Sequence, residues 1–346
     1  MDETSVQALT DAFTVSQIKR AKQSVSENKW NAFLSSTNHE TVSMAHQLKG
    51  LQNNMSIYDS IDPDVVLDSL DLLKVFPDQH QQESTAAEDY TETQLRNLLH
   101  YFKNDFFLWM NAPECQHCGS KETKCVAHVQ EPFEGRWTTE TCRVEVYNCP
   151  LGHTTKFPRL NHPLNLLYSK TGRCGEWVNC FLMVAKCVIG GDFRYIWNVE
   201  DHVWCEFYSP HKQRWIHLDP CEAVMDEPLL YSENWGKAMS LVVGSGEDYM
   251  VDLSTKYITK NRITKPQIKQ KDIQRCISLL NQTTLLQQLT RHNLQYLYVK
   301  AIVRKNKELK SQLSTTTQTP AMTTTIPKGR QSGSAEWTKQ RGEDGL

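Results

Sequence analysis

Residues 172–191 read GRCGEWVNCFLMVAKCVIGG, and FRYIWNVEDHVWCEFYS follows at 193–209. The first stretch predicts a helix from Cys174 to Ile189, because its apolar residues continue up to a Gly-Gly pair of the kind that ends helices. In the second stretch, aromatic and β-branched residues alternate with polar ones, which is the pattern of a strand. We therefore predict an α+β fold in which one helix packs against an antiparallel sheet.

Cys174 is the first candidate for a reactive residue. Glycines lie at positions 172 and 175, and the apolar helix begins directly after the cysteine. A thiol at a helix N-terminus lies near free backbone N–H groups, which favour the thiolate and lower a pKa that is about 8.5 in free cysteine. The alternative is a buried structural cysteine, and we interpret Cys180 and Cys187, inside the same helix, in that way.

The strand after the helix predicts two different faces. Because side chains alternate along a strand, the polar and aromatic residues share one face: His202, Trp204, Glu206 and Tyr208. The opposite face carries the apolar residues Val203, Cys205 and Phe207. A polar turn at 209–213 leads to a return strand, on which Trp215, His217 and Asp219 share a face.

The return strand predicts a partner for His202. If the two strands form a hairpin, Asp219 lies opposite His202 or one diagonal away. A carboxylate there can orient the imidazole, while the other ring nitrogen faces Cys174 and takes its proton. The three residues together predict a Cys-His-Asp site for nucleophilic attack on an amide or ester carbonyl.

Residues 115–160, which are rich in Cys, His and Gly, predict a small insert held by a metal. Cys115 and Cys118 form a C-x-x-C turn, and Cys149 and His153 lie in a second polar turn. Two ligands on each of two turns are typical of a tetrahedral structural zinc site. We predict one structural Zn²⁺ bound by these four residues, with Cys142, Cys125 and His117 as alternative ligands.

The composition is that of a globular protein: 39% of the 346 residues are hydrophobic, which excludes disorder throughout. The net charge of -2 argues against a protein that coats nucleic acid. No apolar run is long enough to cross a bilayer, and no basic segment followed by an apolar one opens the chain, so we expect a cytoplasmic protein. Eleven cysteines in such a chain suit thiols, metal ligands or a nucleophile better than disulfides.

The pattern divides the chain into four parts. We expect a weakly specified helical region at 1–90, a catalytic core at 91–260 that includes the insert, basic helices at 261–310 and a flexible tail at 311–346. Residues 255–310 hold 13 basic and 2 acidic side chains. This stretch is either a solvated helix face or a docking surface for an acidic partner.

From about Tyr58 to Tyr257 the chain resembles the cytosolic peptide:N-glycanases, a branch of the transglutaminase-like cysteine enzymes with a papain-like core. Six landmarks follow the order found in that family: LHYFKNDFF at 99–107, the C-x-x-C turn, FPR at 157–159, GRCGEW at 172–177 with Asn179, DHVW at 201–204, and WIHLD at 215–219.

The resemblance implies roles for particular residues. Cys174 would be the nucleophile, His202 the base and Asp219 the residue that orients it, with a substrate cleft lined by Arg194, Trp204, Glu206 and Trp215. The implied reaction is hydrolysis of the amide that joins an N-linked glycan to Asn, through a thioester, leaving Asp. GRQSGSAEW at 329–337 resembles the opening of the family's carbohydrate-binding C-terminal domain, of which we expect only the start.

The resemblance also implies a cellular setting. Substrates would be unfolded N-glycoproteins in endoplasmic-reticulum-associated degradation, and partners would include proteasome-shuttle proteins with ubiquitin-like and ubiquitin-associated domains. We expect a monomer with no organic cofactor. Two alternatives stay open: a thiol protease or transglutaminase of the same clan, and a catalytically silent adaptor of the same fold. The presence of Cys174, His202 and Asp219 together argues against the adaptor.

Overall fold

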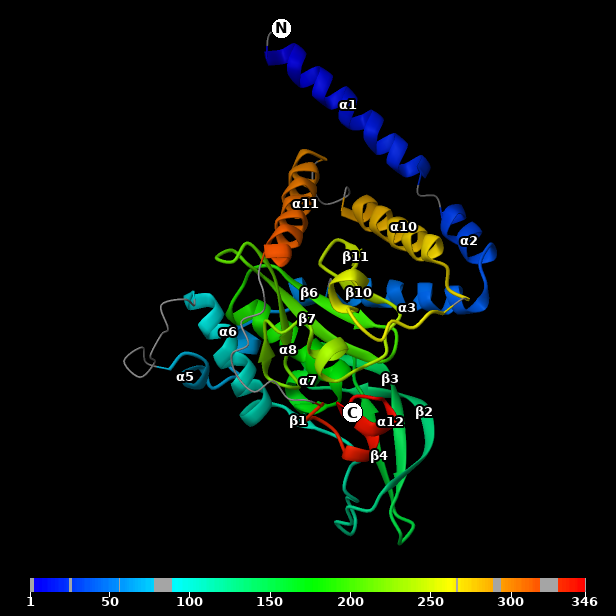
Figure 1. Ribbon diagram of the computed structural model, residues 1–346, viewed down its shortest axis with the longest axis vertical. Coiled ribbons are helices and arrows are strands. Elements are labelled where there is room, and N and C mark those ends of the chain that lie inside the picture. Colours follow the sequence, from blue (N-terminus) through cyan, green and yellow to red (C-terminus); the bar gives the residue numbers. More distant parts are fainter. Residues whose placement is uncertain are drawn as a thin grey trace.

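The computed structural model describes residues 3–24, 27–55, 57–77, 89–265, 267–288, 294–317 and 329–345 (Figure 1). Its helices are α1 (Glu3–Ser24), α2 (Glu27–Ser35), α3 (His39–Met55), α4 (Pro63–Leu67), α5 (Leu72–Val75), α6 (Tyr90–Tyr101), α7 (Pro163–Ser169), α8 (Cys174–Val188), α9 (Ser254–Tyr257), α10 (Gln270–Gln288), α11 (Leu294–Thr317) and α12 (Ala335–Gln340). Its strands are β1 (Leu108–Trp109), β2 (Lys124–Glu134), β3 (Thr139–Asn148), β4 (Thr154–Arg159), β5 (Thr171–Gly172), β6 (Phe193–Asn198), β7 (His202–Ser209), β8 (Arg214–Asp219), β9 (Val224–Met225), β10 (Val242–Ser245) and β11 (Met250–Asp252).

A six-stranded antiparallel sheet, in the order β11-β10-β6-β7-β8-β9, forms the centre of the molecule. Helix α8 packs against β6 and β7, and its apolar side chains share one core with Val203, Cys205 and Phe207. On the other face Trp204 packs with Tyr231 and Trp235 in a separate cluster. The predicted α+β fold, with two different faces on β7, is confirmed.

Helix α8 has the bounds that its sequence predicts, within one residue. It begins at Cys174, where the backbone N–H of Arg173 donates to Glu176 Oε2 at 3.1 Å. After Ile189 the chain turns through Gly190 and Gly191, both with positive φ (71° and 87°). This left-handed conformation has no steric cost in glycine, so the pair stops the helix and sends the chain into β6.

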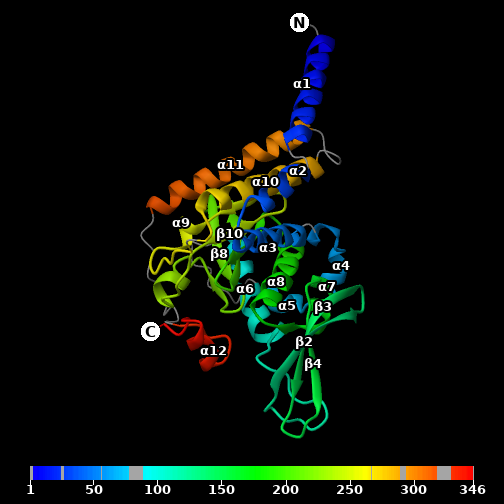
Figure 2. The same cartoon turned by 90° about the vertical axis from the view of Figure 1, so that its right-hand side faces the viewer.

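The insert predicted at 115–160 contains a three-stranded antiparallel sheet, β2-β3-β4. Figure 2 shows this sheet extending from the body at the end of the molecule opposite to α1. The insert is tied to the core by charge, because Glu145 on β3 accepts from Arg173 at 2.8 Å, and Arg159 on β4 pairs with Glu176 of α8. The N-terminus of α8 is therefore held from the insert side.

The basic stretch at 255–310 is partly neutralised within the chain. On α11, Lys300 and Arg304 lie 3.6 and 3.2 Å from carboxylate oxygens of Asp248, and Lys307 pairs with Asp192. Its charges therefore serve in part to seat α11 on an acidic side of the core, an internal role that neither predicted reading included. No helix in the described ranges has the length and apolar content that a membrane span needs.

The C-terminal part differs from the flexible tail predicted at 311–346. Helix α11 continues to Thr317, and the segment 329–345, which includes α12, packs against the core. Buried ion pairs hold it there: Glu343 lies 2.6 Å from Lys237 and 2.8 Å from Arg330. Hydrophobicity alone did not predict this docking, because the contacts are mainly ionic. Residues 318–328 of the predicted Ser/Thr linker lie outside the described residues.

Candidate active site

Cys174 is the first residue of α8 and is partly exposed. Burial raises the pKa of its thiol, and the positive charge of Arg330 opposes that rise. Asp201, Arg341 and Glu176 act on the same thiol more weakly. The predicted position at a helix N-terminus is therefore present, but the predicted lowering of the thiol pKa is wrong, because burial outweighs the groups that favour the thiolate. The positive group that most favours the thiolate, Arg330, comes from the C-terminal segment.

His202 and Asp219 lie together, as the hairpin prediction requires. Strand pairing matches Cys205 with Leu218, which puts Asp219 beside Trp204 and one diagonal from His202. His202 Nε2 lies 3.5 Å from Asp219 Oδ2, and both side chains are fully buried. This is an ion-pair distance without hydrogen-bond geometry. Burial lowers the pKa of His202, so its imidazole is neutral at pH 7 and can accept a proton.

Three hydrogen-bond donors hold Asp219 in place. Its Oδ1 accepts from the backbone N–H groups of Cys221 at 2.9 Å and Glu222 at 3.2 Å, and its Oδ2 accepts from the Tyr231 hydroxyl at 2.8 Å. Burial raises its pKa, but His202, His217 and Arg330 together outweigh burial and leave the net pKa below its usual value. The carboxylate therefore stays charged and fixed in orientation.

Tyr231 and His217 complete this network, and the sequence pattern gave no role to either. Tyr231 gives its single hydroxyl proton to Asp219, so the 2.7 Å contact with His217 Nε2 must be donated by the histidine. His217 is thus neutral with its proton on Nε2. Burial lowers its pKa to about 4, which agrees with this state.

Replacing Tyr231 with phenylalanine is expected to destabilise the fold by about 1–3 kcal/mol, because it leaves the His217 N–H without its acceptor and removes a donor from Asp219. Urea unfolding of Tyr231→Phe measures this, with Tyr168→Phe, whose side chain is exposed, as the matched control. An unfolding curve for Tyr231→Phe that matches the control would contradict the network.

The structure does not join Cys174 directly to His202. Among the described residues, neither side chain hydrogen-bonds to the other, and His202 Nδ1 lies instead 3.3 Å from Arg330 Nη1. Since a guanidinium can only donate, Nδ1 carries no proton and the imidazole proton is on Nε2, facing Asp219. The lone pair of the base is therefore on Nδ1, on the side away from Asp219, where it accepts from Arg330.

The four residues predicted to line a cleft are buried in this structure. Arg194 and Glu206 form an ion pair, Lys256 and the Tyr257 hydroxyl each lie 2.5 Å from Glu206, and the Arg194 guanidinium stacks 4.1 Å from the Trp215 ring. Glu308 of α11 covers Arg194 at 2.6 Å. Trp204 is also fully buried, beside His202. Arg194 and Glu206 therefore belong to a buried group of charges, with Trp204 and Trp215 packed nearby. The role of these four residues toward substrate stays a prediction.

A pocket opens beside the N-terminal turn of α8. Its lining includes Gly175, Glu176 and Asn179 of that helix, together with Tyr58, Arg159 and Tyr195. Its wall begins at Gly175, the residue that follows Cys174. Polar groups from the insert and from the helix therefore meet at this point.

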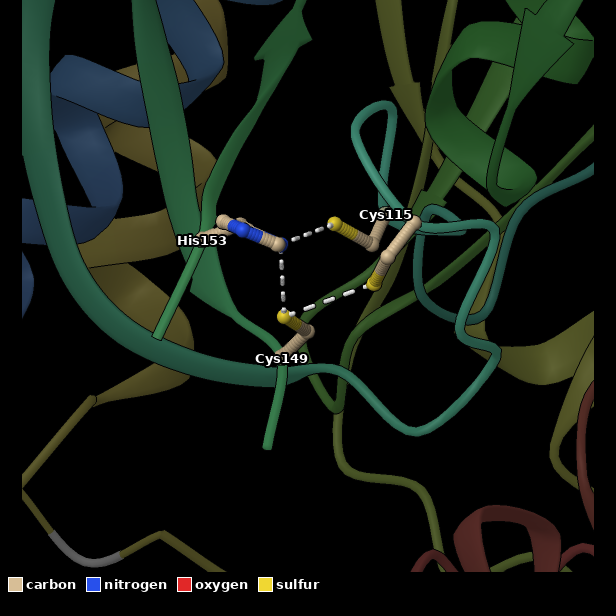
Figure 3. A group of neighbouring side chains, drawn as sticks. Cys115, Cys149 and His153 are labelled. Carbon is tan, nitrogen blue, oxygen red and sulfur yellow. Dashed lines mark hydrogen bonds between the residues drawn. The ribbon is translucent and has the colours of Figure 1, made fainter. Parts of the chain in front are cut away.

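The predicted metal ligands form one cluster. The donor atoms of Cys115, Cys118, Cys149 and His153 all lie within 4.8 Å of one another. Figure 3 shows His153 pointing toward Cys115 and Cys149, with its Nδ1 at 3.9 and 3.6 Å from their sulfur atoms. Three thiols and one imidazole are a donor set that suits zinc, so this cluster could hold a metal.

Of the three alternative ligands, Cys142 and Cys125 lie away from the metal cluster, and only His117 lies near it. Cys142 is buried in the main core, and Cys125 lies 3.7 Å from His128 at the surface. The His117 ring lies near the cluster, with its centroid 5.3 Å from that of His153. The spacing of Cys115, Cys118, Cys149 and His153 in the sequence therefore predicted the residues of the cluster. The hydrogen bonds around Asp219 join residues far apart in the chain and are seen only in the structure.

Comparison with known proteins gives consistent matches. Residues 135–220 match the model of the transglutaminase-like superfamily, and residues 198–315 match the Rad4 transglutaminase-like domain. A peptide-N(4)-(N-acetyl-beta-glucosaminyl)asparagine amidase of Candida albicans is 40% identical, over 89% of this chain and 87% of its own. The amidase of Saccharomyces cerevisiae is 39% identical over 81% of this chain and 80% of its own. A crystal structure of Rad4-Rad23 crosslinked to undamaged DNA is 10% identical, with a TM-score of 0.47, over 84% of this chain and 60% of its own.

A cysteine-bearing helix packed on an antiparallel sheet, together with the superfamily match, defines a transglutaminase-like protein. Within that class, the chain belongs to the peptide-N(4)-(N-acetyl-beta-glucosaminyl)asparagine amidases, because relatives with that name are about 40% identical over more than four fifths of its length. It is an enzyme of this family. The resemblance seen in the sequence landmarks is confirmed.

Proposed function

We propose that this enzyme hydrolyses the side-chain amide that joins an N-linked glycan to asparagine, with Cys174 as nucleophile, His202 as base and Asp219 as the residue that orients it. The observation that carries the proposal is the His202–Asp219 pair. In this neutral buried imidazole one nitrogen is directed at a fixed carboxylate, and the other, which accepts from Arg330 in the resting site, is unprotonated and can take a proton.

The reaction then follows two steps. The Cys174 thiol proton passes to His202 Nδ1 as Sγ attacks the amide carbonyl, whose π electrons move to oxygen. Collapse of this intermediate breaks the C–N bond, and His202 returns the proton to the departing glycosylamine. Water, deprotonated by His202, then attacks the thioester carbonyl; the C–S bond breaks, the proton on His202 returns to the Cys174 sulfur, and the asparagine has become aspartate.

We infer that the Cys115 cluster, with Cys118, Cys149 and His153, holds a structural Zn²⁺. All four ligands come from the protein, which leaves no position for substrate. The metal would order the turns of the insert, and through Glu145 and Arg159 it would help to fix the start of α8. It takes no part in the chemical steps.

The cellular setting is part of the same proposal. The substrates are unfolded N-glycoproteins in endoplasmic-reticulum-associated degradation, the enzyme acts in the cytoplasm, and proteasome-shuttle proteins are its partners. The burial of His202 and Asp219 supports a requirement for an exposed, extended asparagine, since a folded glycoprotein could not reach them.

Incubating the enzyme with a denatured N-glycopeptide tests the activity directly. Mass spectrometry should detect the released glycan and an aspartate at the former glycosylation site, with the peptide backbone intact. Cleavage of the backbone, or of an unglycosylated control peptide, would favour the thiol protease reading instead.

His153→Ala is expected to lower the bound zinc well below one equivalent, because it removes one of four ligands. Metal analysis of the purified variant measures this, and Cys142→Ala is the control, since Cys142 lies in the core rather than in the cluster. Metal loss in Cys142→Ala with full occupancy in His153→Ala would overturn this choice of fourth ligand.

A further inference from the structure

Arg330 is a fully buried cation of the C-terminal segment at the candidate active site. Its side chain is 0% exposed, and Nη1 lies 3.3 Å from His202 Nδ1. No motif in the sequence connects it to this position, because 128 residues separate it from His202. Its contact is with the nitrogen that takes the proton in the proposed reaction.

The guanidinium is held rigidly from several sides. Nη1 donates to Glu343 at 2.8 Å and Nε donates to Ser332 at 2.9 Å, while the rings of Trp109 and Trp337 lie 5.0 and 4.6 Å away. Glu222 accepts from the backbone N–H groups of residues 331 and 332, which anchors the segment to the loop that follows Asp219. The cation is therefore preorganised rather than loosely placed.

One part of this guanidinium has no partner. Nη2 is buried and makes no hydrogen bond, among the described residues, although it carries two donors. A buried donor left without an acceptor is uncommon in folded proteins, and each such group calls for an explanation. The guanidinium that carries the unused donors contacts the His202 nitrogen that takes the thiol proton in the proposed reaction, and its charge acts on Cys174.

We propose that Arg330 is a further catalytic residue, whose guanidinium donates hydrogen bonds to the negative charge that forms first on the Cys174 sulfur and then on the oxygen of the attacked amide. This inference rests on the proposed function.

The hydrogen-bond acceptor of Arg330 Nη1 changes during the proposed reaction. In the resting site Nδ1 of His202 accepts from Arg330. Once Nδ1 has taken the thiol proton it can no longer accept, and the Nη1 donor becomes free. In the proposed reaction the new acceptors are the thiolate and, after attack, the amide oxygen. No proton leaves the guanidinium in either step, because arginine stays charged at any pH of interest.

The test compares Arg330→Gln, which removes the charge but keeps a donor, with Arg330→Lys, which keeps the charge. Glu343 retains Lys237 at 2.6 Å and Arg341 at 3.1 Å in both variants, so the segment keeps much of its anchorage. Lys339→Ala is the matched control, because it removes an exposed positive charge from the same segment. Thermal melting of every variant shows whether the fold is kept.

Two readouts separate this proposal from the proposed function. The first is the rate at which iodoacetamide alkylates Cys174, measured at several pH values from neutral to alkaline. Peptide mass spectrometry detects the alkylated Cys174. We expect Arg330→Gln to slow the alkylation about tenfold or more at neutral pH, the effect of raising the thiol pKa by about one unit. Arg330→Lys should restore part of the rate, and Lys339→Ala should match wild type.

The second readout is hydrolysis of the denatured glycopeptide, for which we expect kcat to fall about 100- to 1000-fold in Arg330→Gln, as when a donor to an oxyanion is removed. Unchanged alkylation and unchanged kcat in a folded Arg330→Gln variant would overturn the proposal. Faster turnover would also overturn it and would instead make the segment an inhibitory cover. If Cys174→Ala hydrolyses glycopeptide as well as wild type does, the proposed function fails. The alkylation rates still test whether Arg330 favours the Cys174 thiolate.

Discussion

Cys174→Ala is expected to lower glycopeptide hydrolysis at least about a thousandfold, because it removes the sulfur that forms the thioester in the proposed reaction. The thiol lies at the first position of α8, one residue before Gly175 of the pocket wall, and the charge of Arg330 acts on it. Alanine keeps the backbone there, and the side chain is only partly buried, so the fold should be unaffected. Mass spectrometry of the glycopeptide after incubation with each protein measures both glycan release and conversion of Asn to Asp.

Cys187→Ala is the matched control, since Cys187 is on the same helix and is also partly buried. It should retain activity within a few-fold of wild type. Full activity in Cys174→Ala would remove the nucleophile assignment. If wild type itself releases no glycan while its fold and metal are intact, the silent adaptor would become the better reading.

Removal of the metal is expected to unfold the insert and to lower the melting temperature of the whole protein. Ligand binding by structural zinc contributes directly to folding, at about 10–16 kcal/mol in zinc-finger peptides. The effect should also reach the active site, because Glu145 on β3 contacts Arg173 and Arg159 on β4 contacts Glu176. Hydrogen exchange over residues 115–160, thermal melting and glycopeptide hydrolysis, before and after a chelator, measure the three effects.

The control for metal loss is Cys125→Ser, because Cys125 is an exposed thiol of the same insert outside the cluster. It should bind metal and melt like wild type, whereas Cys149→Ser should behave like the chelated protein. A chelated sample that is shown to lack metal and that melts like wild type would exclude a structural metal here.

Much of the candidate site followed from local patterns. Alternation along β7 and β8 predicted which side chains share a face, and the hairpin register then limited Asp219 to two positions relative to His202. The structure has the diagonal one. The ligand spacing likewise predicted the residues of the metal cluster. These predictions succeed because side-chain direction along a strand, or around a tight turn, depends on neighbours in the chain.

Other parts of the site came from residues distant in the sequence. Tyr231 reaches Asp219 from a π-helical turn, and Glu308 of α11 covers Arg194, so residues predicted for a cleft lie beneath a helix. The tail predicted as flexible carries Arg330 and Glu343, which are buried as ion pairs. Hydrophobic periodicity does not predict such docking, because it reports apolar burial and not the pairing of charges.

The sequence by itself determined the α+β core, the helix that begins at Cys174, the two faces of β7 and the set of metal-ligand candidates, since each depends on interactions between residues close along the chain. Only the tertiary structure decided how Asp219 is held, which nitrogen of His202 is unprotonated, and that Arg330 contacts this nitrogen. These contacts join separate segments, and their geometry depends on packing the whole chain around one sheet.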